Sequence, residues 1–270
     1  MSEKIALVTG ASSGIGRCVA EDLNKAGYVV YGTSRQAPDA AWPSSIHHLH
    51  LDLAKPGEAA RVVDAVIGKH GKIDLLINNA GLGLEPAAAE ESSLAQAKLV
   101  FDVNFFGLIE ITQAVLPHMR SQAKGRIVNV SSALGFMPMP YMALYCASKH
   151  ALEGYSEALD HEIRGFGVRA VLVEPSYTRT RFDQNAAQAD RKIAAYEATR
   201  TRLYQHLKGM LEKADSPELV SAVVLEAALA EQPKMRYTAG KGAGFLKVLR
   251  HFVPAGLAEK AIRKDLKLDA

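Results

Sequence analysis

The sequence predicts an α/β fold in which a doubly wound parallel sheet forms a single domain. Short β-rich runs alternate with longer helical patterns, which is typical of parallel βαβ units. The runs are continuously apolar, as in Ile5-Ala6-Leu7-Val8, which suits strands that are buried on both faces. The chain of 270 residues, 48% of them hydrophobic, is long enough for one sizeable core.

The individual elements follow from local composition, taken in chain order. The β-rich runs predict strands at 4–9, 28–34, 47–52, 73–78, 126–131 and 169–174, and a short strand at 235–238 closes the sheet. Apolar residues at helical spacing between them predict helices at 15–26, 57–70, 94–119, 146–166, 187–213 and 217–230. The sequence has no internal repeat, low-complexity stretch or convincing linker, so one domain is expected.

Composition narrows the functional class. The first five residues lead directly into a strand, so no signal peptide is expected, and no apolar stretch approaches the roughly 20 residues of a membrane span. Cys18 and Cys146 are expected to be free thiols, which predicts a cytoplasmic protein. From Lys234 to the end, nine Lys or Arg face three Asp or Glu, which makes this tail the source of the net charge of +3. The tail carries no recognised nucleic-acid motif, so no nucleic-acid partner is expected.

A glycine-rich turn follows the first strand directly. Its sequence is Thr9-Gly10-Ala11-Ser12-Ser13-Gly14-Ile15-Gly16, and a helix begins within it. Gly10 permits a tight turn, and Gly14 and Gly16 let a pyrophosphate approach the backbone. The helix start offers N–H groups and a positive dipole end. The position after the first strand favours a phosphate-binding loop over a glycine-rich turn with no ligand.

Tyr145 and Lys149 are one helical turn apart, so their side chains share a helix face. A phenol has an ordinary pKa of about 10, and a neighbouring ammonium lowers that pKa because it favours the phenolate. Such a tyrosine can exchange a proton with a carbonyl or an alcohol near neutral pH. The spacing alone is common by chance, so the pair depends on the motifs around it.

Three motifs in order make the chain resemble the short-chain dehydrogenase/reductase family. They are the T-G-x-x-x-G-x-G loop, the segment Asn78-Asn79-Ala80-Gly81, and Ser132 placed thirteen residues before Tyr145. The resemblance covers roughly residues 4–240. It implies a Rossmann-like sheet and hydride transfer with a nicotinamide cofactor. Residues 1–240 are then the dinucleotide-binding and catalytic domain, and 241–270 are a helical tail packed on it.

The resemblance assigns a role to each residue of the expected catalytic set. Tyr145 would be the general acid in reduction and the base in oxidation, and Lys149 would hold the nicotinamide ribose and acidify the phenol. Ser132 would hydrogen-bond the substrate oxygen. Asn104 would position a water in a proton relay to the lysine. The alternatives are strand-end capping for Ser131 and Ser132, favoured for Ser131, and a helix-kink role for Asn104.

The residue after the second strand indicates the cofactor. NAD-binding units usually place an acid near this point for the ribose 2′-hydroxyl, whereas 28–38 contains no acid and the strand leads into Arg35. A guanidinium can bind a 2′-phosphate bidentately, so NADP(H) is expected. A solvent-exposed Arg35 is the alternative, and Asp39 could overturn the argument. The resemblance adds Asp52 and Leu53 at the adenine and Asn79 at its ribose.

The complete expected cofactor-binding set follows the chain from the glycine loop to the end of the sixth strand. It comprises Gly10, Ser12, Ser13, Gly14, Ile15, Gly16, Arg35, Asp52, Leu53, Asn79, Ala80, Gly81, Tyr145, Lys149, Pro175, Thr178 and Thr180.

The segment after the sixth strand departs from the family pattern. The family commonly has Pro-Gly-x-x-x-Thr, whereas this chain has Pro175-Ser176 at the first two positions. If the backbone there requires a positive φ, Ser176 is strained; otherwise it is tolerated. Thr180 is expected to bond the carboxamide or the phosphates, and Thr178 to contribute backbone contacts to the nicotinamide.

Two apolar segments indicate the substrate. Segment 134–142 contains three methionines and, with the variable segment after 180, predicts a pocket for a hydrophobic alcohol or ketone. Simple packing of this loop against the core is equally compatible. Residues 245–253 of the tail have near-helical apolar spacing with basic residues between. A helix packed on the domain or on a partner subunit is favoured, with weak peripheral membrane contact as the alternative.

The sequence therefore predicts an NADP(H)-dependent oxidoreductase acting on a hydrophobic ketone, aldehyde or secondary alcohol. The alternatives are a 3-oxoacyl-carrier-protein reductase and a non-catalytic dinucleotide-sensing regulator, which has no need of a proton relay. His47, His48 and His50 lack a third ligand on one face, so no metal site is expected. Helix 94–119 resembles the family's dimer-forming helix, so a homodimer or homotetramer is expected.

Overall fold

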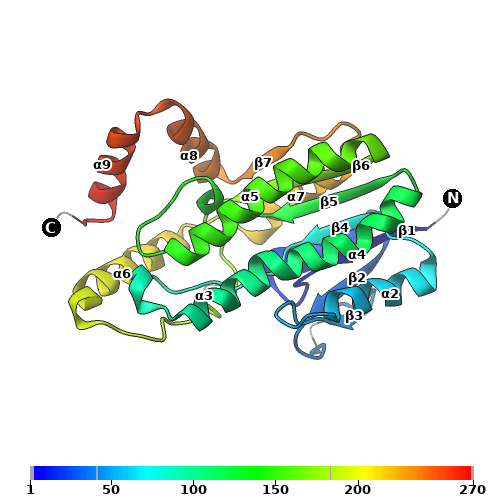
Figure 1. The fold of residues 1–270 in the computed structure, drawn as a ribbon, viewed down its shortest axis with the longest axis horizontal. Coiled ribbons are helices and arrows are strands. Elements are labelled where there is room, and N and C mark those ends of the chain that lie inside the picture. Colours follow the sequence, from blue (N-terminus) through cyan, green and yellow to red (C-terminus); the bar gives the residue numbers. More distant parts are fainter. Residues whose placement is uncertain (1–2, 41, 183, 269–270) are drawn as a thin grey trace.

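The computed structural model describes residues 3–40, 42–182 and 184–268. Within these ranges, seven strands form one parallel sheet in the order β3-β2-β1-β4-β5-β6-β7, with helices on both faces (Figure 1). This is the doubly wound, Rossmann-like architecture that the sequence predicts. Met1 and Ser2 of the expected N-terminus, and residues 269–270 of the expected tail, lie outside the described residues.

All seven strand predictions are confirmed to within two residues at either end. The strands are β1 (Lys4–Val8), β2 (Tyr28–Ser34), β3 (Ile46–His50), β4 (Leu75–Asn78), β5 (Gly125–Val130), β6 (Val168–Pro175) and β7 (Arg236–Ala239). Apolar runs signal these strands clearly because both faces of the sheet are covered by helices.

The helices agree with the sequence less uniformly. They are α1 (Gly14–Lys25), α2 (Glu58–His70), α3 (Leu94–Phe101), α4 (Gly107–Ser121), α5 (Ala143–Ile163), α6 (Glu197–Glu212), α7 (Pro217–Leu229), α8 (Lys241–Phe252) and α9 (Ala255–Asp265). The run expected at 94–119 is helical from Leu94 to Ser121, with a π-helical turn inside it. One expectation is wrong, because the helix expected at 187–213 begins only at Glu197. Residues before it pair with a neighbouring loop instead, through a bridge between Leu84 and Ala187.

The sheet has an apolar core on each face. On one face, Leu23 of α1 and Val224 of α7 pack against the strands. On the other face, Val63 of α2, Val115 of α4 and Leu159 of α5 do the same, and these helices lie in front of the sheet in Figure 1. Burial on both sides holds the strand ends in register and so positions the loops that follow them.

One helical run within the described residues, Leu94–Ser121, is long and apolar enough to cross a membrane by length and composition. This corrects the expectation that no stretch approaches a span. Its most apolar window is 39% buried, and Ile111, Val115 and Met119 belong to the core under the sheet. A helix of a soluble protein that packs one face into the core can be equally long and apolar, so length and composition are weak evidence for a membrane segment.

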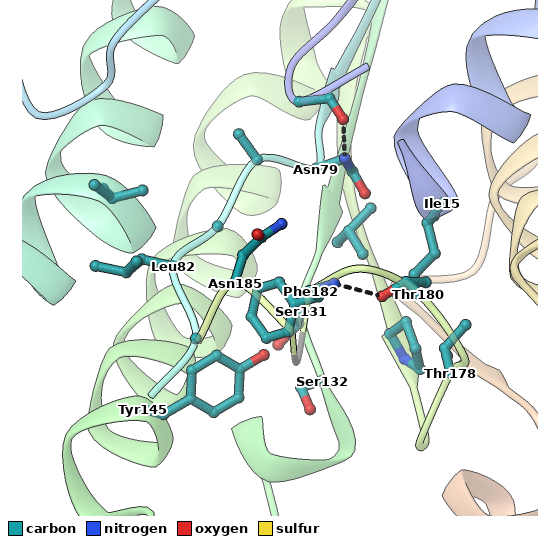
Figure 2. Close-up of a pocket in the computed structure, with 18 of the residues that line it drawn as sticks. Ile15, Asn79, Leu82, Ser131, Ser132, Tyr145, Thr178, Thr180, Phe182 and Asn185 are labelled. Atoms are coloured by element: carbon teal, nitrogen blue, oxygen red, sulfur yellow. Dashed lines mark hydrogen bonds between the residues drawn. The ribbon is translucent and has the colours of Figure 1, made fainter. Parts of the chain in front are cut away.

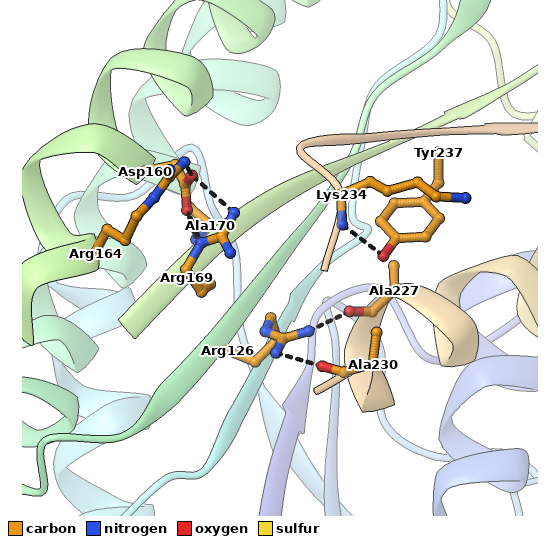
Figure 3. Close-up of polar contacts among 9 residues, drawn as sticks. All are labelled: Arg126, Asp160, Arg164, Arg169, Ala170, Ala227, Ala230, Lys234 and Tyr237. Atoms are coloured by element: carbon orange, nitrogen blue, oxygen red, sulfur yellow. Dashed lines mark hydrogen bonds and ion pairs between the residues drawn. The ribbon is translucent and has the colours of Figure 1, made fainter. Parts of the chain in front are cut away.

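Asp160 is a fully buried carboxylate that ties α5 to β6 (Figure 3). It accepts hydrogen bonds from Arg169 Nε at 2.7 Å, from Arg164 Nη2 at 2.5 Å and from the Ala170 N–H at 3.0 Å. Burial opposes ionisation, but these donors outweigh it and hold the pKa of Asp160 below its usual range. The neighbouring Arg126 donates to carbonyls at the end of α7 and so anchors that helix to the sheet.

We expect Asp160→Asn to lower the free energy of unfolding by about 1–3 kcal/mol, because the amide cannot accept all of these bonds. The native pKa of Asp160 is depressed, so its contribution is present above the unfolded-state pKa of about 3.9 and is lost as pH falls through the native value. Urea unfolding of both proteins at pH 7 and near pH 3 measures this. An equal difference at both pH values would contradict the assignment.

The tail forms two helices where one was expected. α8 follows β7 directly and buries Ala243, while Phe245 and Phe252 on the same helix are 67% and 75% exposed. α9 buries Ala258, and Leu266 at its C-terminal cap is also buried. The two helices lie at one end of the molecule, beside the carboxyl end of β7 (Figure 1).

Candidate active site

A cavity of about 350 Å³ lies at the carboxyl ends of the strands, where the strand order reverses between β1 and β4. Crevices at this position are the usual ligand sites of open parallel sheets. With two exceptions, every residue of the expected catalytic and cofactor-binding sets lines this cavity. The exceptions are Gly16 and Asn104.

The glycine loop after β1 has the backbone geometry that its glycines predict. Gly10 and Gly14 have φ angles of +69° and +56°, a region that disfavours side chains. Asn79, at the end of β4, donates through Nδ2 to the carbonyls of Thr9 and Gly10 at 3.0 and 3.2 Å. The Thr9 hydroxyl accepts from the Asn79 N–H at 3.0 Å. Asn79 therefore braces the loop in addition to lining the cavity (Figure 2).

The N-terminus of α1 faces the cavity in a form that suits an anion. Ser12, Ser13, Gly14 and Ile15 all line the cavity at this point. The side chain of Ser13, the N-cap residue, makes no capping hydrogen bond, and the first turn contains no acidic residue. The N–H groups at the helix start are thus not satisfied by capping, and the dipole there favours negative charge. These residues fit the pyrophosphate of a dinucleotide.

Gly16 corrects one detail of the sequence analysis. We expected it to let a pyrophosphate approach the backbone, but it does not line the cavity. A Cβ at Gly16 would lie 2.3 Å from the carbonyl oxygen of Gly10 and 2.3 Å from Nδ2 of Asn79. The absence of a side chain at Gly16 instead lets α1 pack closely against the turn, which is the role of the third glycine in dinucleotide-binding loops.

Tyr145 and Lys149 lie near the start of α5 and line the far end of the cavity together with Ser132. Figure 2 shows the Tyr145 ring and the Ser132 side chain at this end. Tyr145 is 8% exposed, and the ammonium of Lys149 lies 5.8 Å from its ring centroid. Ser132 Oγ accepts a hydrogen bond from the Leu134 N–H at 3.1 Å, so the capping expected of Ser131 is performed by Ser132. A hydroxyl that accepts this bond can still donate its proton into the cavity.

Lys149 is the buried cation of the site. Its ammonium donates to the Val130 carbonyl at 3.0 Å and the residue is only 5% exposed. Burial lowers the pKa of Lys149 to about 8, while the carboxylate of Glu153 opposes that fall. The charge of this lysine is therefore sensitive to its surroundings near neutral pH.

Asn104 lies in the π-helical turn Asp102–Phe106, behind the cavity wall. Its Oδ1 accepts from the Leu82 N–H at 2.7 Å, and its Nδ2 donates to the Leu82 carbonyl at 3.0 Å and to Ser148 Oγ at 3.2 Å. The helix interruption that was the alternative for Asn104 is thus present. It also ties the cavity loop to α5, so its amide groups are engaged in the protein itself.

The cavity wall at the end of β2 contains Arg35, and the end of β3 contributes Asp52 and Leu53. Asp39, the residue that could overturn the cofactor argument, does not line the cavity. The hydroxyl of Ser34, the residue before Arg35, forms a hydrogen bond with His48 Nε2 at 2.9 Å. In the described part of the chain, no group of three or more His, Cys, Asp or Glu residues could hold a metal ion.

Ser176 is tolerated at the position where the family commonly has glycine. Its φ is not among the positive values of the described residues, so the backbone there is unstrained. Its hydroxyl donates to Asp215 Oδ2 at 3.0 Å, which ties the end of β6 to the segment before α7. Thr180 lies against Gly14, where a Cβ would be 3.0 Å from the threonine side chain, and its Oγ1 accepts from the Phe182 N–H.

The sequence analysis did not single out Tyr177, Phe182, Asn185 or Leu246, which also line the cavity. The Phe182 ring lies 6.0 Å from the Tyr145 ring (Figure 2) and packs on Gly83. These residues come from an irregular segment and from α8, so no periodic pattern marked them. The sequence showed the apolar spacing of the tail, but it did not show which tail residues would reach the cavity.

Comparison with known families decides the classification. Residues 4–191 match the family described as short chain dehydrogenase. The chain belongs to this family. A 3-ketodihydrosphingosine reductase of Bacteroides thetaiotaomicron is 40% identical over 185 residues, which is 68% of each protein. A short-chain dehydrogenase of Streptomyces avermitilis has the same fold, with a TM-score of 0.82 and 30% identity over 100% of this chain and 99% of that one.

Solved structures of two more distant members, each 25% identical, contain different cofactors. A serine dehydrogenase was solved with NADP+, with a TM-score of 0.73 over 87% of this chain and 93% of that one. A short chain dehydrogenase/reductase of Burkholderia phymatum was solved with NAD, with a TM-score of 0.76 over 99% and 95%. Family membership thus supports a nicotinamide cofactor and leaves the choice between its two forms to the residues of the site.

Proposed function

We propose that this short-chain dehydrogenase is an NADP(H)-dependent carbonyl reductase or alcohol dehydrogenase that acts on a lipophilic substrate. One observation carries the proposal. Ser132, Tyr145 and Lys149 lie together at one end of a cavity whose other end combines an uncapped helix N-terminus with Arg35. A proton-transfer group, an oxygen-binding hydroxyl and a dinucleotide cradle therefore share one crevice.

The proposed roles follow from the chemistry of each group. A bound nicotinamide supplies or accepts the hydride. Tyr145 donates its phenolic proton to the carbonyl oxygen in reduction and takes it back in oxidation, and Lys149 stabilises the phenolate that forms. Ser132 donates a hydrogen bond to the same oxygen and stabilises its developing negative charge. The Lys149 ammonium would also hold the nicotinamide ribose, while Asn104 keeps the loop at Leu82 in place.

We propose NADP(H) because Arg35 is the charged side chain that borders the cavity at the end of β2. A carboxylate there would repel a 2′-phosphate, whereas a guanidinium can bind it through two hydrogen bonds. Asp52 and Leu53 would contact the adenine.

We expect Arg35→Ser to weaken NADPH binding about tenfold or more and to leave NADH binding nearly unchanged, because a charge-assisted hydrogen bond contributes about 1.5–3 kcal/mol. Fluorescence titration of both cofactors against both proteins measures this. Arg17→Ser, on the first turns of α1 and outside the cavity lining, is the control and should leave both affinities unchanged. Equal losses for NADPH and NADH in Arg35→Ser would contradict the assignment.

We propose a lipophilic substrate because the catalytic end of the cavity is apolar. Leu134, Met142, Phe182 and Leu246 line it with Tyr145. The relationship to a protein named 3-ketodihydrosphingosine reductase supports a ketone with a long alkyl chain. The deciding assay is a panel of lipophilic ketones, aldehydes and secondary alcohols, with NADPH and NADH in parallel. If no panel compound supports turnover but NADPH binds, the dinucleotide-sensing alternative replaces this proposal.

We also propose that the protein is a homo-oligomer through α4 and neighbouring elements. Leu99 of α3 and Phe106 of the π-helical turn before α4 are 43% and 55% exposed. Large apolar side chains exposed on one helical run favour burial against another subunit. Sedimentation at several protein concentrations would reveal the association.

A further inference from the structure

A buried ion cluster lies beside the catalytic lysine and takes no part in the chemistry proposed above. We call it the Arg236 cluster; it consists of Arg236 on β7, Glu153 and Glu157 on α5, and Glu174 on β6. Arg236 Nη1 contacts a carboxylate oxygen of both Glu153 and Glu174. The side chains of Glu153 and Glu174 are 6% and 0% exposed, whereas that of Glu157 is 48% exposed. Two carboxylates are therefore buried and share one guanidinium.

Glu153 is the member of this cluster that lies beside a residue of the cavity wall, Ser131. It follows Lys149 by one helical turn, so the two side chains lie on the same face of α5. The space around Gly135 shows how closely Glu153 approaches Ser131. A Cβ on Gly135 would lie 2.7 Å from Glu153 Oε1 and 2.6 Å from Oγ of Ser131, which lines the cavity. Only a glycine leaves room for the carboxylate beside the cavity wall.

Oε1 of Glu153 is also an unusual atom in its own right. Both it and Ser131 Oγ are buried beside Gly135, and the Ser131 hydroxyl interacts with the carboxylate and favours its ionised form, although the contact falls short of standard hydrogen-bond geometry. The other oxygen of the Glu153 carboxylate, Oε2, accepts from Arg236, so Oε1 is the oxygen on the side of Ser131. A buried carboxylate oxygen that has only one hydroxyl as a donor is costly to ionise unless a nearby charge compensates it. The ammonium of Lys149 is the cation on the same helix face.

The charges around Glu153 come from four elements. On α5 it is flanked by Lys149 and by the half-exposed Glu157. From the sheet it faces Arg236 of β7 and Glu174 of β6, and Lys247 of α8 lies 3.8 Å from Glu174. Burial and the charge of Glu174 raise the pKa of Glu153 to about 7, and the Ser131 hydroxyl and Arg236 oppose this rise. Burial lowers the pKa of Lys149 to about 8, and the charge of Glu153 opposes that fall, so the ionisation of Glu153 favours the charged lysine.

We propose that Glu153 is a positioning residue that acts through Lys149: its buried carboxylate keeps the lysine ammonium charged inside the apolar end of the site, and Arg236 and Gly135 hold that carboxylate in place. The expected effect of Glu153 on catalysis rests on the proposed function. The expected effect of Glu153 on the protonation of Lys149 does not, because it depends only on the charges within the protein. Loss of the carboxylate leaves Lys149 buried without the charge that offsets its desolvation.

The test compares Glu153→Gln with Glu157→Gln, which contacts the same arginine from the solvent side. We expect the alkaline limb of the kcat/KM profile to move about one pH unit lower in Glu153→Gln, since a neighbouring opposite charge shifts a pKa by about 1–3. In Glu157→Gln the limb should not move. Unchanged limbs in both variants would overturn the proposal, and so would a Glu153→Gln protein that melts at a lower temperature with an unaltered profile.

A second measurement keeps the test independent of turnover. Competitive acetylation of the apoprotein across pH, read at the Lys149 peptide by mass spectrometry, reports the protonation of its amine. The midpoint should fall by about one pH unit in Glu153→Gln and stay in place in Glu157→Gln. If the wild type reduces no carbonyl compound yet the midpoint shifts, the proposed function is wrong and the Glu153 assignment stands. If Glu153→Gln does not fold, Glu153→Asp should give a smaller shift in the same direction, and no shift would refute the assignment.

Discussion

Tyr145→Phe is expected to reduce turnover about 10²–10⁴-fold while leaving NADPH affinity within about twofold, because general acid–base catalysis contributes about that much to rate. Phenylalanine keeps the ring against Phe182 and removes only the hydroxyl that exchanges the proton. Steady-state kinetics with the best substrate of the panel, followed by loss of the reduced nicotinamide, measures kcat. Fluorescence titration measures the affinity for NADPH in the same preparation.

Tyr155→Phe is the matched control for this prediction. Tyr155 lies on the same helix, two to three turns further along, and packs on Phe105 with 6.0 Å between the ring centroids. Burial raises the pKa of Tyr155 to about 12, so its phenol keeps its proton near neutral pH. Its loss should leave kcat unchanged. Full turnover by Tyr145→Phe, or an equal loss in the two variants, would exclude the proposed role of Tyr145.

Gly16→Ala is expected to weaken NADPH binding more than tenfold and to lower the free energy of unfolding by about 1–3 kcal/mol, the usual range for overpacking. The new Cβ would lie 2.3 Å from a backbone oxygen of Gly10 and from the Asn79 amide, and the backbone oxygen cannot rotate away. The turn that leads into α1 must therefore move, and with it the helix start that faces the cavity. Urea unfolding and NADPH titration measure the two effects.

Gly68→Ala is the control for the effect of an added methyl group. Gly68 is exposed on α2, and a Cβ there would meet nothing within 4 Å. A helical glycine in open space gains about 0.5–1 kcal/mol when replaced by alanine. Gly16→Ala and Gly68→Ala should thus shift stability in opposite directions. A neutral Gly16→Ala with full NADPH affinity would show that the loop tolerates a side chain at this position.

The parts of the fold that were predictable from sequence have local causes. The strands are apolar runs because helices cover both faces of the sheet, and their bounds lie within two residues of those expected. The π-helical turn at Asn104 was considered only as an alternative, and the late start of α6 was missed, for the opposite reason. Asn104 hydrogen-bonds the backbone of Leu82. The residues before α6 form a β-bridge to Leu84, and the buried Glu91 accepts a hydrogen bond from the Ile193 N–H at 2.9 Å. These partners are distant in sequence, so no local pattern contains them.

The features of the candidate site also fall into those with local causes and those that depend on distant contacts. The sequence by itself determined the glycine loop, the Tyr145–Lys149 pair with Ser132, and the basic residue after β2, because their spacings encode a turn, a helix face and a strand end. Only the tertiary structure decided that Gly16 packs behind the turn, and that Phe182 and Leu246 close the cavity. It also brought Glu153 and Arg236 together beside Lys149. Burial and charge compensation depend on which distant segments meet, and that is a property of the folded chain.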